Sequence, residues 1–392
     1  MKFFRDSWPI VKFGDVVRQC KESVDRDNNP FDRYVEGGHM DSENIHIRRW
    51  GTFGEDYVGP AFHRIFRKGQ VLYGSRRTYL KKVAMAEFDG ITANTTLVCE
   101  TRDPDVLLQE LLPFLMLTDA FTEHSIRESK GSTNPYINWP DIAKFEFPLP
   151  PLEEQKRIAE ILWAADEAVE NYVQSRKHTE DIRACEVELL LDSLECEPVP
   201  LMEVLSGSPE SGCSAVPARS ETGHWVLSLA ALSSRGYVRD NLKPVKRTKA
   251  MEEATLRNGD LLISRSNTTE LVGFAGIFNE DRVDVSFPDT MMRLPLDSTK
   301  VMPEYLEMVL LSPRGRKHMR RTASGTSSSM KKINRRTLAE FMLPVPSQAR
   351  QRDIVLRCAE LDARLTELNV HIEKLRAIYR RIGNDSLGAA HV

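Results

Sequence analysis

Two glycine-centred loops carry the residue types that contact nucleic acids. Residues 312–336, SPRGRKHMRRTASGTSSSMKKINRR, contain nine lysines and arginines, seven serines and threonines, and no acidic residue. Lysine and arginine bind phosphates, arginine binds guanine edges, and short hydroxyl side chains make close polar contacts with DNA. An earlier loop, GSTNPY at residues 131–136, has the same glycine followed by short polar residues. Both loops are therefore candidates for duplex recognition, and the alternative for the basic one is a solvated loop or helix face.

Further basic clusters follow strand-like runs in each half of the chain. Arg64, Arg67 and Lys68 form one, and residues 75–82 form a second that includes Tyr79. Tyr73, just before it, is at least as well explained by packing within a strand. The predicted DNA contacts in the first half are Ser75, Arg76, Arg77, Tyr79, Lys81, Lys82, Ser132, Thr133, Asn134 and Tyr136. Those in the second half are Lys246, Arg247, Ser264, Arg265, Asn267, Arg316, Lys317, Arg320, Arg321, Thr326, Ser327, Ser328, Lys331 and Lys332.

Signatures of catalysis are weak throughout the chain. Asn134-Pro135-Tyr136 resembles the Asn-Pro-Pro-Tyr signature of amino-methyltransferases, but it lacks the second proline and no glycine-rich cofactor loop precedes it. A Walker lysine motif, a GxSxG elbow and an HExxH zinc motif are all absent. The histidines at 39, 46, 63 and 224 have no ligand spacing and are interpreted as ordinary polar or packing residues. We therefore predict no catalytic residue and no metal site.

The composition is that of a soluble globular protein with more than one domain. The chain has 392 residues, of which 41% are hydrophobic and 28% charged, and this length accommodates two to three domains. A charged start, MKFFRDSWPIVKFGD, predicts that there is no signal peptide, and six cysteines without a CxxC pair predict reduced thiols in the cytoplasm. The net charge of −3 argues against a nucleic-acid partner, but the charges are segregated along the chain, so local potential matters more.

The second half of the chain repeats the first. KGQVLYGSRR around Gly69 matches NGDLLISRS around Gly259, and FEFPLP at 145–150 matches FMLPVP at 341–346. Gln155, Ile158 and Asp166 match Gln351, Ile354 and Asp362. The two copies share their framework and differ at the loop tips, which is the pattern expected of two modules that read different half-sites.

A long helix is predicted after each proline-rich junction. In the second, apolar residues recur every four or three positions, as in a coiled coil, at Ile354, Cys358, Leu361, Leu365, Leu368, Ile372, Leu375, Tyr379 and Ile382. The central run starts alike at Ile158, loses register near Arg176, and resumes through Ile182, Leu189 and Leu190. The central helix carries a net charge of −7 and the terminal one +3, which favours pairing of the two.

These boundaries predict five segments. They are a first recognition domain at 1–151, a central spacer helix at 152–196, a second recognition domain at 197–346, a C-terminal helix at 347–382 and a tail at 383–392. A helix of about 42 residues is roughly 60 Å long. Sites one turn apart on duplex DNA are roughly 34 Å apart. The helices are therefore predicted to space two DNA-reading heads.

The junction into the central helix resembles a known family. GSTNPYINWPDIAKFEFPLPPLEEQKRIAEIL, residues 131–162, is similar to the corresponding junction in the DNA-specificity subunits of Type I restriction–modification enzymes. WPIVKFGDVV near the start and KGQVLYGSRRTYLKKVAMAEFDGI resemble that family's first target-recognition domain. The resemblance implies an α+β fold in which two α/β target-recognition domains, related by a pseudo-two-fold tandem repeat, are joined by two long antiparallel coiled-coil helices.

The resemblance also implies a function and partners. It implies a non-catalytic subunit that reads a bipartite target in double-stranded DNA and binds no cofactor itself. Two methyltransferase subunits would carry S-adenosylmethionine, and through them two translocase-nuclease subunits would use ATP and Mg²⁺. Partner binding is assigned by this resemblance to Leu152, Glu154, Gln155, Ile158, Gln351 and Ile354.

One departure and two alternatives accompany this hypothesis. At the second junction Arg350 stands where the first junction has Glu154, so the two docking surfaces would not be equivalent. The alternatives are a self-sufficient nuclease or methyltransferase with an unrecognised site, and a free-standing DNA-binding regulator. Activity of the purified chain without a second polypeptide would favour the enzyme.

Overall fold

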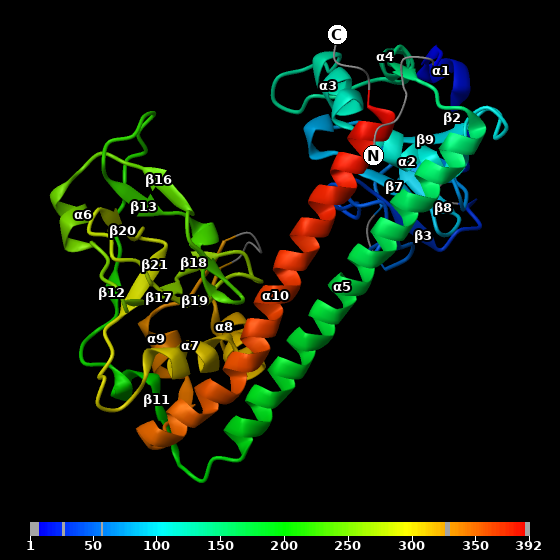
Figure 1. Ribbon diagram of the computed structural model, residues 1–392. Helices are drawn as coiled ribbons and strands as arrows, with labels where there is room; N and C mark the ends of the chain where they lie inside the picture. The colour runs from blue at the N-terminus through cyan, green and yellow to red at the C-terminus, as the bar shows by residue number, and fades with distance from the viewer. Residues whose placement is uncertain (1–7, 26–27, 56–57, 326–329, 389–392) are drawn as a thin grey trace. The chain divides into compact units, whose positions relative to one another are not determined.

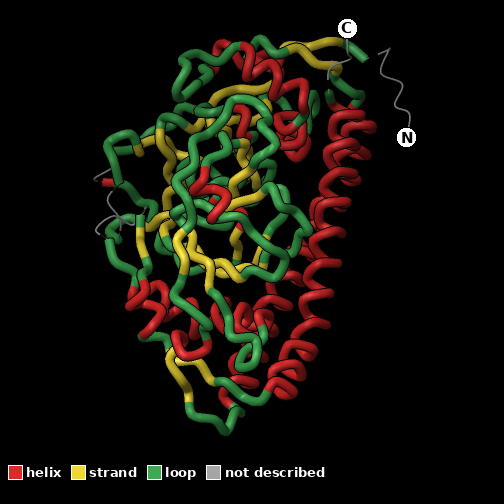
Figure 2. The backbone as a smooth tube through the Cα atoms, turned by 90° about the vertical axis from the view of Figure 1, so that its left-hand side faces the viewer, coloured by secondary structure: helices red, strands yellow, loops and turns green. Residues whose placement is uncertain are grey.

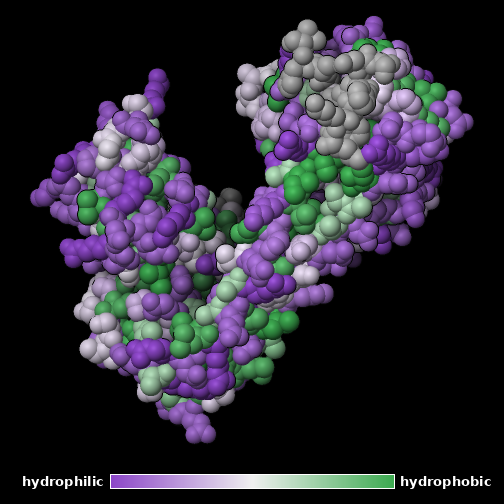
Figure 3. Space-filling view, viewed as in Figure 1, coloured by the Kyte–Doolittle hydropathy of each residue, from purple (hydrophilic) through white to green (hydrophobic). Residues whose placement is uncertain are grey.

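The structure is a computed structural model that describes residues 8–25, 28–55, 58–325 and 330–388. It contains both helices and sheets and divides into two compact units, unit 1 with residues 1–173 and 370–392, and unit 2 with residues 174–369. Figure 1 labels the elements, and Figure 2 shows short strands joined by many loops. On the face seen in Figure 3 the surface is mainly hydrophilic. None of the described helices is both long and apolar enough to cross a membrane.

Unit 1 contains two four-stranded sheets and a separate strand pair. The antiparallel sheet has the order β2 (Val17–Cys20), β9 (Thr96–Thr101), β6 (Val71–Gly74) and β7 (Val83–Met85). The mixed sheet has the order β4 (Gly51–Thr52), β3 (Arg33–Val35), β8 (Gly90–Ala93) and β5 (Phe62–Phe66), with β3 parallel to β8. β1 (Ile10–Lys12) pairs with β10 (Glu146–Pro148).

The apolar run of β6 is explained by burial on both faces of its sheet. Val71 and Tyr73 enter the main core of unit 1, whereas Leu72 between them enters a second core. Alternate residues of a strand point to opposite faces, so a strand covered on both sides is apolar throughout. The main core also receives the helices α1 (Phe13–Val16), α2 (Leu112–Leu117), α3 (Asp119–Arg127) and α4 (Trp139–Ile142).

Unit 2 is assembled in a similar way. Its antiparallel sheet has the order β12 (Glu210–Ser211), β21 (Met291–Leu294), β17 (Leu261–Ser264) and β19 (Ala275–Ile277). A mixed sheet has the order β16 (Leu242–Pro244), β13 (Trp225–Leu227) and β20 (Val285–Ser286), with β13 parallel to β20. The separate pairs are β11 (Pro198–Pro200) with β23 (Met342–Pro344), β14 (Leu232–Ser233) with β15 (Gly236–Tyr237), and β18 (Ser266–Asn267) with β22 (Lys331–Lys332).

The short helices of unit 2 include two that match α2 and α3. The helices are α6 (Lys249–Glu253), α7 (Pro303–Leu311), α8 (Pro313–Thr322) and α9 (Arg335–Ala339). Ser312 caps α8 by accepting a hydrogen bond from Gly315 N, as Thr118 caps α3 by accepting one from Phe121 N. His318 on α8 contacts the carbonyl of Thr337 at 2.8 Å. On α3, a histidine contacts the carbonyl of Asp141 at the same distance. Each unit therefore builds the same helical corner.

The two junctions into the long helices are held by equivalent buried glutamines. Gln155 accepts a hydrogen bond from Leu108 N and donates to the carbonyls of Val106 and Pro150, at 2.8–2.9 Å. Gln351 makes the corresponding three bonds to Met302 N, Lys300 O and Pro346 O, also at 2.8–2.9 Å. Gln155 is 1% exposed and Gln351 0%. Each glutamine thus satisfies backbone groups that its own unit buries.

The long helices α5 (Leu152–Asp192) and α10 (Gln348–Leu387) pack antiparallel within each unit. In unit 1, Tyr172 stacks on His371 with ring centroids 5.5 Å apart. In unit 2, Arg176 lies 3.5 Å from Asn369 and Arg183 pairs with Asp362. The predicted tail of 383–392 is wrong at its start, because α10 continues to Leu387, a residue that the core of unit 1 buries completely.

The predicted loss of register in α5 near Arg176 is also wrong. Ile182 and Leu189, two residues expected on the apolar seam, are 56% and 65% exposed, whereas Leu190, the third, is buried as expected. The spacing of four and three residues from Val169 and Tyr172 continues instead through Arg176 and Arg183. These arginines reach Asn369 and Asp362 of α10, so polar pairs take the place of apolar ones while the register is kept.

Candidate nucleic-acid interface

In unit 1, the glycine loop and the segment after β6 are joined by a backbone ladder. Lys130 and Tyr136 exchange hydrogen bonds of 2.8 and 2.9 Å, which closes a hairpin around Gly131. Gly131 has φ of +87°, a conformation that favours glycine. The hairpin then bonds to the neighbouring segment, since Ile137 N donates to Ser75 O at 3.0 Å and Arg77 N to Pro135 O at 2.7 Å. Residues far apart in sequence are thereby fixed side by side.

The ladder presents exposed polar side chains. The guanidinium of Arg76 lies over the ring of Tyr136, 4.9 Å from its centroid. Arg77 Nε donates to Asn134 Oδ1 at 3.2 Å. Tyr79 is 54% exposed on the same segment. Ser132 and Thr133, at the hairpin tip, are also exposed.

Unit 2 has the same ladder with different side chains. Ser324 and Lys332 exchange hydrogen bonds of 2.9 and 2.8 Å, and Ile333 N donates to Arg265 O at 2.9 Å. Ser266 pairs with Lys332 where unit 1 pairs Arg76 with Tyr136. Lys331 Nζ donates to Gly325 O at 2.6 Å and is thereby held close to the hairpin. The predicted contacts Thr326, Ser327 and Ser328 lie outside the described residues.

The basic run at 312–336 is not one loop, as half of it forms α8 and α9. Arg316 is 8% exposed, lies 4.1 Å from the centroid of Phe274, and donates to Glu270 O at 2.9 Å. Burial lowers the pKa of Arg316 to about 10, and Arg320 adds to this shift. Arg316 is therefore corrected from a predicted DNA contact to a packing residue, because its face of α8 points into the unit. Lys317 and Arg321 are exposed, and Arg320 pairs with Glu270 at 2.7 Å.

Five other predicted contacts are also occupied within the chain. Ser75 donates to Thr95 O at 2.7 Å, and Ser264 and Asn267 are buried beside one another at 3.4 Å. Lys81 pairs with Asp119 at 2.6 Å, and Lys82 donates to Gly37 O. Because the side chains of Ser75, Ser264 and Asn267 are buried, these three are corrected to positioning residues. Lys81 and Lys82 are not buried and stay predicted contacts, since an ammonium group has three donors.

Lys246 and Arg247 lie at a different place in unit 2. They follow Val245, which bridges to Pro217 beside the mixed sheet, and Arg247 pairs with Glu252 at 2.8 Å. Both side chains are exposed. The described contacts do not join them to the hairpin of Ser324 and Lys332.

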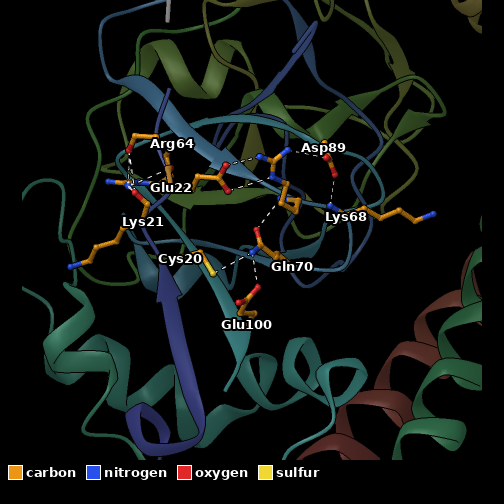
Figure 4. A network of polar contacts seen from close by, with 10 residues as sticks. Cys20, Lys21, Glu22, Arg64, Lys68, Gln70, Asp89 and Glu100 are labelled. Atoms are coloured by element: carbon orange, nitrogen blue, oxygen red, sulfur yellow. Dashed lines mark hydrogen bonds and ion pairs between the residues drawn. The ribbon is translucent and has the colours of Figure 1, made fainter. Parts of the chain in front are cut away.

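The cluster around Arg64 holds the edge of the mixed sheet in unit 1. Figure 4 shows Arg64 directed at the carbonyl of Lys21, to which it donates a hydrogen bond. Arg67 pairs with Glu22 at 2.5 Å. Lys68 extends away from the network (Figure 4). The two arginines are thus structural, whereas the ammonium group of Lys68 remains at the surface.

Sequence reasoning missed cations that the fold places next to the hairpin. Arg127 ends α3, has a side chain that is 70% exposed, and precedes the hairpin residue Lys130. Lys130 pairs with Asp141 at 2.8 Å, and together with Lys144 this lysine lowers the pKa of Asp141. The signal in the sequence that could have identified Arg127 and Lys130 is their position just before Gly131. Among the described residues no group of histidines, cysteines or acids is arranged to hold a metal ion.

The residues assigned to partner binding need a correction. Gln155, Gln351, Ile158 and Ile354 are at most 1% exposed, so their side chains are enclosed by their own unit. The apolar pair enters the two main cores. Of the six residues assigned to partner binding, Leu152 and Glu154 are the two that remain partly exposed. The buried residues of this motif hold the junction together. A partner can reach the exposed positions around them.

Comparisons with known proteins agree with this framework. Residues 6–176 match the family model described as the Type I restriction modification DNA specificity domain. The chain is 29% identical over 177 residues to the EcoDI specificity subunit of Escherichia coli, covering 43% of this chain and 38% of that protein. It is 27% identical over 289 residues to the EcoKI specificity subunit of Escherichia coli K12, covering 66% of this chain and 61% of that protein.

Solved structures show the same fold at low sequence identity. One is a chain from a study of complex assembly and conformational transition of the type I R-M system, with a TM-score of 0.53, 20% identity and 97% coverage of both chains. Another is the Type I restriction-modification S subunit from M. genitalium, with a TM-score of 0.51, 14% identity, and coverage of 100% of this chain and 99% of that one. The chain spans less than two thirds of the curated relatives that it matches. Residues 6–176, a little under half of the chain, therefore resemble the Type I restriction modification DNA specificity domain, and the chain is similar to the specificity subunits of Type I restriction enzymes.

Proposed function

We propose that this chain is the sequence-specific DNA recognition subunit of a Type I restriction–modification complex. Each unit reads one half-site of a bipartite target in double-stranded DNA. The observation that carries the proposal is the repeated backbone ladder, which presents Arg76 and Tyr136 in unit 1 but Ser266 and Lys332 in unit 2. A shared frame with different exposed side chains is what two base-reading modules require.

The long helices act as the spacer between the half-sites. In this proposal α5 and α10 form an antiparallel coiled coil that joins two α/β recognition domains, with the domain boundaries expected from the sequence. α5 has 41 residues and is therefore about 60 Å long. The polar pairs of Arg176 with Asn369 and of Arg183 with Asp362 support one fixed alignment of the helices.

The chain is the non-catalytic member of its complex. Two methyltransferase subunits carry S-adenosylmethionine, and through them two translocase-nuclease subunits use ATP and Mg²⁺ in the cytoplasm. The names of the relatives, which are specificity subunits, support this role. The docking surface includes the exposed parts of the junctions near Leu152, Glu154 and Arg350. The charge difference between Glu154 and Arg350 makes the two docking surfaces unequal.

Methylation mapping tests the proposal. Cells that express the chain with its methyltransferase subunits should carry methylated adenines in one bipartite motif. Replacing residues 1–148 by the same region of a relative should change one half-site and leave the other. A simultaneous change of both half-sites would contradict independent reading by the two units.

The same preparation separates the alternatives. The purified chain should neither methylate nor cleave mixed duplex DNA when S-adenosylmethionine and Mg²⁺ are supplied. Activity of the single polypeptide would make it an enzyme. Specific DNA binding without any association with methyltransferase subunits would make it a free-standing regulator.

A further inference from the structure

We propose that Arg76 reads a guanine in the half-site bound by unit 1. The inference rests on the proposed function and assigns a base to one side chain. Unit 1 brings several cations together at the ladder of residues 75–77 and 130–137, and a side chain that binds an edge of a base needs free N–H donors.

Most of these cations are committed within the chain. Lys81 pairs with Asp119, Lys82 donates to Gly37 O, and Lys130 pairs with Asp141. Arg77 uses Nε to hold Asn134, and its backbone is in the left-handed region with φ of +50°. These contacts shape the hairpin.

Arg76 differs from its neighbours in having an exposed, uncommitted guanidinium. Among the described residues, no carboxylate or hydrogen-bond acceptor lies within bonding distance of it, and its contact is with the ring of Tyr136 at 4.9 Å. A guanidinium attracted to the face of an aromatic ring spends none of its N–H groups on a conventional acceptor. The contact with Tyr136 therefore restrains the guanidinium of Arg76 without consuming its donors.

The backbone around this stack is rigid. Arg76 and Tyr136 lie opposite one another in the ladder, with the hydrogen bonds of Ser75 and Arg77 on either side. A pre-organised side chain loses little entropy when it binds. Paired donors in one plane match O6 and N7 of guanine in the major groove, which is the commonest specific contact of arginine with DNA.

Unit 2 supplies an internal comparison. The position of Arg76 is taken there by Ser266, which is 6% exposed, and the position of Tyr136 by Lys332. A buried serine beside a lysine offers no planar pair of donors. This position of the ladder therefore supplies a guanine contact in unit 1 but not in unit 2.

The test uses the full chain expressed with its methyltransferase subunits. Binding is measured with duplexes in which each base pair of the wild-type target is replaced in turn, over a series of salt concentrations. Arg76→Ala and Arg76→Lys should both lose discrimination at one G·C pair of one half-site, by roughly 5- to 150-fold. The dependence on salt should stay as in the wild type, because no phosphate contact is lost.

The same binding measurement includes a control variant, and it has outcomes that would overturn the proposal. Arg18→Lys alters an arginine of unit 1 that pairs with Glu100 away from the ladder, and it should leave every preference unchanged. Uniformly weaker binding by Arg76→Ala, with a salt slope lower by about 1 and rescue by Arg76→Lys, would make Arg76 a phosphate contact and overturn the proposal. Unchanged binding by both variants would overturn it as well. A wild-type complex without any sequence preference would instead refute the proposed function.

Discussion

Replacing Gln155 by methionine should destabilise unit 1 by at least about 3 kcal/mol. The change leaves Leu108 N, Val106 O and Pro150 O without the partner that now bonds to each at 2.8–2.9 Å. Gln155 is 1% exposed, so water cannot replace the amide without rearrangement. Each buried backbone group left unpaired costs roughly 1–3 kcal/mol. Methionine has a similar volume, so the loss reports hydrogen bonding more than cavity formation.

Thermal unfolding of the purified chain, followed by circular dichroism or calorimetry, measures this loss. For a unit of this size, about 3 kcal/mol corresponds to a Tm lower by roughly 6–12 °C. Gln351→Met should lower the Tm of unit 2 by a similar amount, because its three bonds are equivalent. Gln174→Met, at an exposed position of the same helix, is the matched control and should change stability by less than about 0.5 kcal/mol.

The result also separates a structural glutamine from a docking one. If Gln155→Met melted within about 2 °C of the wild type yet failed to bind methyltransferase subunits, the hydrogen-bond reasoning would be refuted. A side chain that acts by holding its own unit should instead lower the Tm of the chain before any partner is added.

Three further predictions follow from contacts of the described residues. A hydrogen bond to Asp166 raises the pKa of His46 to about 9. The protonated histidine therefore stabilises the fold by up to roughly 3 kcal/mol below pH 6.5, and this stabilisation is lost as the pH rises through about 9. Thermal melts over this pH range should show the loss, and the His46→Gln variant should not show it. Lys332→Ala should lower the salt slope of DNA binding by about 1. Lys331→Ala should lower the slope less, because the ammonium group of Lys331 is held at Gly325 O. Equal slopes for the two variants would contradict this difference. Inserting seven residues into each long helix, after residue 173 of α5 and residue 369 of α10, should lengthen the DNA spacer by about three base pairs in methylation maps. The same insertion into α5 alone should misalign the helices and abolish specific methylation.

The helix starts and the repeat could be read from the sequence because they depend on local signals. Pro150 and Pro346 mark the two junctions, and α5 and α10 start within two residues of them. The apolar periodicity of α10 also identified side chains that the structure buries, such as Ile354 and Ile372. Such patterns arise from neighbours along the chain, so no knowledge of the partner surface is needed.

The remaining features depend on partners distant in sequence. His46 has no informative neighbours, and its bond to Asp166 joins residues 120 positions apart. Ile182 was expected on the seam because apolar residues usually take that face, but Arg183 takes it through its ion pair with Asp362. The basic composition around Arg316 indicated DNA binding, whereas the orientation of α8 encloses its guanidinium. Composition alone does not reveal which face of a helix is covered.

The strand pairs at the base of each unit bear on how such a chain can evolve. β1 pairs with β10, and β11 pairs with β23, so the first strand of each unit meets the strand just before its long helix. A recognition segment therefore leaves and re-enters the framework at one place. If each unit reads one half-site, as proposed, recombination between related genes at the two strands of one pair would exchange an entire recognition domain and leave the helical framework intact. New specificities could then arise in a single genetic event, with one half of the target inherited unchanged.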